Sequence, residues 1–122
     1  MIIDRARLDE GLALFSDGRW FEAHEVLEAA WRPLAPGPDR HFLQGLIQLA
    51  VALEHWRRGN PRGARGQWEK AQRHLDGLGD VYAGVQLARL LEDFRAYWAS
   101  VGLDAPAPNT PVACAPVPRW QP

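Results

Sequence analysis

Apolar residues recur at helical spacing in several stretches of the chain, and none alternates between apolar and polar positions over a useful length. The most apolar stretch runs from His41 to Trp56, with a seam formed by Phe42, Leu46, Leu49, Leu53 and Trp56. A helix that is apolar nearly all round belongs in the centre of a bundle, with neighbours on several sides. The pattern therefore predicts an all-α fold of about five helices, without strands.

Four further helices are predicted around the central one. The expected ranges are about 4–16, 19–32 and 61–78, and a last helix carries apolar positions from Leu87 to Val101. Glycine and proline mark the boundaries, because glycine ends helices in the left-handed conformation and proline disfavours helical geometry before it. We expect Asp39 to cap the central helix and Asn60 to cap the fourth, with Pro61 at its first position.

A faint internal repeat indicates how the helices pair. Positions 18, 23, 27 and 30 align at one fixed offset with Gly59, Ala64, Trp68 and Ala71. Each unit is a helix, a glycine turn and a second helix, a pattern that resembles tetratricopeptide hairpins. We therefore predict a domain of helical hairpins over residues 1–101, followed by a proline-rich, extended or disordered tail over 102–122. In this tail, Val117 and Trp120 could dock on the body or on a neighbouring subunit.

A polar line runs through the otherwise apolar central helix. His41, Gln44 and Gln48 lie along it, and a buried amide without a partner costs about 1–3 kcal/mol. The second helix offers acidic and imidazole groups, and two arginines can supply positive charge. We therefore predict one polar cluster between the second and third helices, made of His24, Glu25, Glu28, Arg32, Arg40, His41, Gln44 and Gln48.

The same cluster admits several interpretations. A hydrogen-bonded network that fixes the register of two helices needs no ligand, whereas a small-ligand pocket would use the glutamines and carboxylates to bind polar groups. Carboxylate-bridged metal bundles use Glu-x-x-His pairs, which this chain lacks. We therefore predict no metal and no cofactor, and we assign no catalytic residue, although burial could adapt Glu25 or Glu28 with His24 to acid–base work.

Composition narrows the classes of function. The chain has 122 residues and a formal net charge of -1, so no overall field recruits nucleic acid or a membrane. A basic cluster between Arg57 and Arg73 is interpreted as a solvated face. The single cysteine, Cys114, is compatible with a reducing compartment, no signal peptide is visible, and the longest apolar run is too short to cross a bilayer. A cytoplasmic protein is expected.

Two segments resemble a known family. Residues 15–31, with Phe21-Glu-Ala-His-Glu25, and residues 40–55, with Gly45-Leu-Ile-Gln48, are similar to the domain-of-unknown-function family 309. The family motifs fall on Glu22, His24, Glu25, Glu28, Trp31, Gln44, Gly45 and Gln48. The resemblance implies a compact helical bundle and no established activity.

Two functions of different classes follow from these observations. The first is a small binding or adaptor module for an unknown small molecule or protein partner, with a polar cluster that is mainly structural. The alternative is a metal-dependent or acid–base enzyme of hydrolase type that uses Glu25, Glu28 and His24. Nucleic acid and membranes are not expected partners, and homo-oligomerisation stays open.

Overall fold

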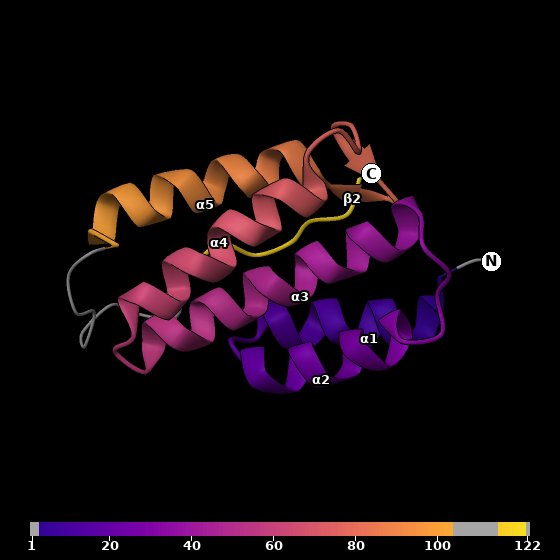
Figure 1. Cartoon of the computed structure of the whole chain (residues 1–122), viewed down its shortest axis with the longest axis horizontal. Coiled ribbons are helices and arrows are strands. Elements are labelled where there is room, and N and C mark those ends of the chain that lie inside the picture. Colours follow the sequence, from indigo (N-terminus) through magenta and orange to yellow (C-terminus); the bar gives the residue numbers. More distant parts are fainter. Residues whose placement is uncertain (1–2, 104–114, 122) are drawn as a thin grey trace.

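The computed structural model describes residues 3–103 and 115–121 of the chain. Within these ranges the fold is mainly helical, with five helices and one two-stranded antiparallel sheet (Figure 1). The elements are α1 (Arg5–Ser16), α2 (Trp20–Trp31), α3 (Pro38–Arg57), α4 (Pro61–Leu75), β1 (Val81–Tyr82), β2 (Val85–Gln86) and α5 (Leu87–Val101). The predicted five helices are confirmed, and the predicted absence of strands is wrong.

The helix ends follow local chemistry, with one departure from expectation. The Asn60 side chain caps α4 by accepting from the backbone N–H of Gly63, as predicted. By contrast, α3 begins at Pro38 after an N-cap at Gly37, so Asp39 lies inside the first turn. Its carboxylate accepts a hydrogen bond from the Tyr82 hydroxyl at 2.5 Å instead. Burial, together with this carboxylate, raises the pKa of Tyr82 to about 12.

The helices pack as two antiparallel hairpins, α1 with α2 and α3 with α4, and α2 also packs on α3 (Figure 1). Small residues allow the close approaches. A Cβ on Gly11 would lie 2.5 Å from Leu27 Cδ2, and a Cβ on Gly45 would lie 2.5 Å from Leu75 Cδ2. The helix that approaches Gly45 is α4, through Leu75. Glycine at position 45 is therefore required by the packing of α3 against α4.

Large rings connect α5 to the rest of the core. Phe94 stacks on Trp68 at a centroid distance of 5.5 Å and meets the edge of Phe15 at 6.4 Å. Trp98 lies edge-on to Trp56 at 5.9 Å. Aromatic pairs of this geometry contribute beyond the area they bury. The aromatic side chains thus fill the space between α5 and both hairpins.

A short hairpin joins α4 to α5. Its two turn residues, Ala83 and Gly84, both have positive φ, 49° and 83°, which is the geometry of a two-residue type I′ turn. The segment near the carboxyl end extends the pairing: Gln86 N–H donates to the Arg119 carbonyl at 2.9 Å, and Val85 is bridged to Trp120. Of the two placements that the sequence leaves open for Trp120, the structure shows contact with the body, and the side chain stays 41% exposed. Residues 104–114 of the tail, with Cys114, lie outside the described residues.

No helix in the described ranges is both long enough and apolar enough to cross a bilayer.

Candidate functional site: a pocket between α2 and α3

The predicted polar cluster is divided between two sides of α3. Gln48 is buried, with 8% of its surface exposed, and its Oε1 lies 2.8 Å from His74 Nδ1 on α4. The prediction that Glu25, Glu28 or His24 would bond this amide is therefore wrong. The physical reason is the close packing of α4 at Gly45, one turn before Gln48, which places α4 against this face of α3.

His74 completes the polar contact on the α4 side. Its Nδ1 also lies 3.1 Å from the Lys70 carbonyl, and because both neighbours are acceptors, Nδ1 carries the hydrogen. Burial lowers the pKa of His74, and nearby His41 and Arg73 act in the same direction. The His41 ring lies 5.4 Å from that of His74. Gln44 is half-buried, and its side chain makes no hydrogen bond within the described residues.

The other predicted members make their contacts within α2 or with the loop that follows it. Glu28 pairs with Arg32 and lies 3.5 Å from His24 Nε2, while Glu25 is exposed. Arg40 stacks on Trp31 at 3.9 Å and donates to the carbonyls of Trp31 and Leu34, at 3.3 and 2.7 Å. Arg40 thus holds the loop between α2 and α3. The structure does not bring the eight predicted residues into one site.

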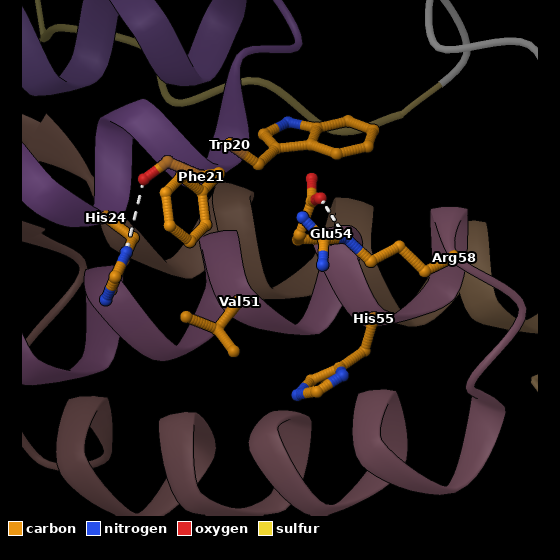
Figure 2. A pocket seen from close by; sticks show the side chains of 7 residues that line it. All are labelled: Trp20, Phe21, His24, Val51, Glu54, His55 and Arg58. Carbon is orange, nitrogen blue, oxygen red and sulfur yellow. Dashed lines mark hydrogen bonds and ion pairs between the residues drawn. The ribbon is translucent and has the colours of Figure 1, made fainter.

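A pocket lies instead at the other end of the contact between α2 and α3 (Figure 2). Its volume is about 190 Å³, and it is lined by Trp20, Phe21, His24, Val51, Glu54, His55 and Arg58. Only His24 belongs to the predicted cluster. Phe21 is 49% exposed, and it is an apolar side chain in the helical line that also contains Glu25, Glu28 and Arg32. That apolar residue in a polar line was the sequence signal for the pocket.

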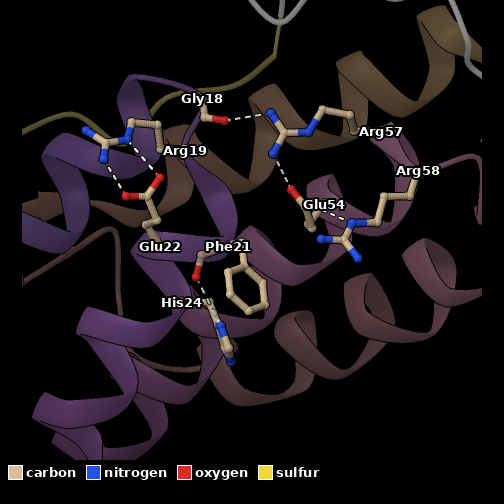
Figure 3. A network of polar contacts seen from close by, with 8 residues as sticks. All are labelled: Gly18, Arg19, Phe21, Glu22, His24, Glu54, Arg57 and Arg58. Atoms are coloured by element: carbon tan, nitrogen blue, oxygen red, sulfur yellow. Dashed lines mark hydrogen bonds and ion pairs between the residues drawn. The ribbon is translucent and has the colours of Figure 1, made fainter.

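Ion pairs hold the polar wall of this pocket in place. Glu54 accepts hydrogen bonds from Arg57 and from Arg58 Nε, the latter at 2.6 Å (Figure 3). Burial raises the pKa of the Glu54 carboxyl, but the two arginines outweigh this and lower it. Arg57 also donates to the Gly18 carbonyl at 2.8 Å and lies 4.5 Å from the centroid of the Trp20 ring. The end of α3 is therefore fixed to the turn between α1 and α2.

The described residues contain no group of three or more His, Cys, Asp or Glu side chains arranged to hold a metal ion. His24, the imidazole nearest to the predicted acidic residues, faces acceptors of its own helix: Nδ1 lies 3.2 Å from the Phe21 carbonyl, and Nε2 lies near Glu28. Glu28 in turn is engaged by Arg32. These contacts stabilise α2 itself.

The fold and the pocket together define a small helical-hairpin protein with an apolar site between its two hairpins. Residues 8–67 match the model of DUF309, a domain of unknown function, and this segment belongs to that family. The resemblance stated from the sequence is thereby confirmed. The matched range includes α2 and α3, and so every residue that lines the pocket.

Two relatives extend the comparison. The chain is 39% identical over 101 residues to the uncharacterized protein YpuF of Bacillus subtilis (strain 168), which covers 80% of this chain and 57% of that protein. It is 28% identical over 94 residues to an uncharacterized protein of Aquifex aeolicus (strain VF5), which covers 77% of this chain and 27% of that protein. The chain thus spans less than two thirds of either relative.

Proposed function

We propose that the protein is a small binding module whose ligand inserts an apolar group into the pocket between α2 and α3. The observation that carries this proposal is the half-exposed Phe21 beside a pocket whose other walls are fixed. Ligand sites are concave and mainly apolar, with a few placed polar groups. The predicted binding or adaptor function is kept, and its proposed location moves from the polar cluster to this pocket.

The size of the pocket limits the ligand. Its volume is about 190 Å³, whereas a cavity of about 150 Å³ accepts benzene and drug-sized ligands occupy roughly 300–1,000 Å³. A single ring with a small substituent therefore fits. Such a ring would contact Phe21 and Val51, two side chains that are already positioned by their helices (Figure 2).

The contacts of the acidic residues favour binding over the alternative of an acid–base enzyme. Glu28 is engaged by Arg32 and His24, and Glu25 is exposed to solvent away from the pocket lining. A general base must reach the proton that it removes from a bound substrate. Of the three residues of that alternative, only His24 borders the pocket.

The proposal is tested with benzyl alcohol, a neutral single-ring probe, and binding is followed by NMR of the Trp20 side-chain N–H and the Val51 methyl groups. We expect saturable shifts confined to residues that line the pocket. Val51→Phe fills the pocket and should abolish the shift of Trp20. Leu91→Phe, at a half-buried position of α5 outside this pocket, is the matched control and should leave the shift unchanged.

Shifts spread over the surface, or equal loss in both variants, would contradict a site at this pocket. We place the binding activity in the cytoplasm, supported by the sparing use of cysteine. The partner is proposed to be a small molecule or a protein side chain of matching chemistry, and a homo-oligomer stays a prediction for measurement of mass in solution.

A further inference from the structure

The polar groups that border the pocket are unequal in what they offer a ligand. Among the described residues that line the pocket, Glu54 is the one carboxylate, and each of its oxygens accepts from an arginine, Oε1 from Arg57 and Oε2 from Arg58. A carboxylate offers about four acceptor sites, so Glu54 keeps some capacity to accept, but two guanidinium groups balance its charge. The acidic residue therefore belongs to the wall of the pocket and does not select for a cation.

Arg58 retains unused donors at the same place. Its Nε donates to Glu54, and its four terminal N–H groups have no hydrogen-bond acceptor within the described residues. The guanidinium lies 6.0 Å from the centroid of the Phe21 ring, so it stands beside the apolar wall (Figure 2). Two guanidinium groups, from Arg57 and Arg58, face one carboxylate, and the local charge is positive.

His55 adds a second donor whose tautomer is fixed by its neighbours. Asn60 Oδ1 accepts from the Gly63 N–H at 3.0 Å, so the amide nitrogen of Asn60 faces His55 Nδ1, at 3.2 Å. An amide nitrogen only donates. His55 Nδ1 therefore carries the lone pair, and the hydrogen of the ring is on Nε2. The His55 ring lines the pocket, and its N–H is a donor on that side of α3.

His24 adds no free hydrogen-bond acceptor to the pocket. Its ring nitrogens face the Phe21 carbonyl and the Glu28 carboxylate of the same helix. The pocket thus combines an aromatic and aliphatic interior with free donors, and the charge of its carboxylate is balanced by two guanidinium groups. A complementary ligand has a ring and an acceptor that carries negative charge.

We propose that the pocket binds an aromatic monocarboxylate, with the ring against Phe21 and Val51 and the carboxylate accepting from Arg58 and His55. This inference rests on the proposed binding function and names the ligand class of the same site. Arginine suits the role because its planar donors match a carboxylate in pairs. The Arg58 side chain is 65% exposed, so solvent screens the attraction and the gain is moderate.

The test compares phenylacetate with phenylacetamide, which has nearly the same shape and no charge. Binding is followed by NMR at the Val51 methyl groups, with both compounds in the millimolar range expected for ligands of this size. We expect phenylacetate to bind about fivefold to tenfold more tightly than the amide. In Arg58→Gln this difference should disappear while the amide binds as before. Arg62→Gln, which removes an exposed arginine outside the pocket lining, should keep it.

The outcomes separate the two proposals. Equal affinity for acid and amide at Val51 overturns the carboxylate inference and leaves the binding function standing. Absence of any localised shift with either compound overturns both. Equal loss of preference in Arg58→Gln and Arg62→Gln shows a general effect of charge and also overturns the inference.

A further arm identifies the source of the carboxylate. A short peptide that ends in phenylalanine is compared with its amidated form. Preference for the free carboxyl end at an affinity above that of phenylacetate supports a protein terminus as ligand. Weaker binding than phenylacetate supports a free small acid, and binding of the amidated peptide as tightly as the acid form contradicts carboxylate recognition.

Discussion

The two sides of α3 pack differently against their neighbouring helices. Toward α4, Gly45 admits Leu75 and the buried Gln48 is bonded to His74. Toward α2, near Val51, the surface remains concave and Phe21 stays half-exposed. Buried polar groups are costly without partners, so the side with a matched pair is architecture. The side toward α2 has fixed walls and hydrogen-bond donors without acceptors among the described residues, and a ligand can bind there.

The largest expected effect on stability is on the side of α3 that packs against α4. Gly45→Ala would place a Cβ 2.5 Å from Leu75 Cδ2, and overpacking of this kind costs about 1–3 kcal/mol of stability. Gly66→Ala, at a helical glycine with nothing within 4 Å, is the matched control and should stabilise by about 1 kcal/mol. Chemical denaturation followed by circular dichroism measures both. Equal effects of the two alanines would contradict the close approach of α4.

The next effect compares a polar group from each side. Gln48→Ala removes the acceptor of His74 and leaves a gap, which should destabilise the protein by about 2 kcal/mol. Glu28→Gln removes a largely exposed pair with Arg32 and should cost less than about 1 kcal/mol. Urea denaturation of both variants provides the test. A larger loss for Glu28→Gln would place the structural network between α2 and α3, where the sequence first suggested it.

The wrong partner of Gln48 shows what periodicity predicts and what it leaves open. The spacing of apolar and polar residues placed Gln44 and Gln48 on one line of α3, and that line exists. The helix that covers this line is α4, which approaches α3 closely at Gly45. Helical periodicity does not predict which neighbouring helix packs on a given face. Glu28 and His24 were near in sequence, but their bonds close within α2.

The short hairpin was missed for a local reason. Its strands have two residues each, and its type I′ turn uses Ala83 with a φ of 49°. The usual signature of that turn is Asn-Gly or Asp-Gly, so neither alternation nor turn chemistry was visible. The pocket was missed although Phe21 stands in a polar line, because its other walls include Val51 and Glu54 of α3. A concave surface between two helices cannot be assembled from the pattern of one of them.

A smaller, pH-dependent effect on stability is expected from His74, which lies on the side of α3 that packs against α4. The folded protein lowers the pKa of His74 below its ordinary 6.5, so the unfolded chain binds its proton first. The contribution of this group is thus complete above about pH 6.5 and is lost as the pH falls toward the lowered value. Wild type should lose more stability than His74→Asn between pH 7 and 5 in thermal denaturation. Parallel curves would show that His74 keeps its ordinary affinity for protons in the fold.

The smallest effect on stability is expected on the side of α3 that faces α2. A single variant there separates the effect on ligand binding from the effect on stability. Phe21 is 49% exposed and is not part of the buried core. Phe21→Ser should therefore change the free energy of unfolding by less than about 1 kcal/mol. The same substitution removes a wall of the pocket and should weaken the binding of benzyl alcohol severalfold. Thermal denaturation and NMR titration of one preparation measure both quantities. A residue that matters to a ligand and little to the fold is what a binding surface requires, whereas a large loss of stability with unchanged binding would make Phe21 part of the core.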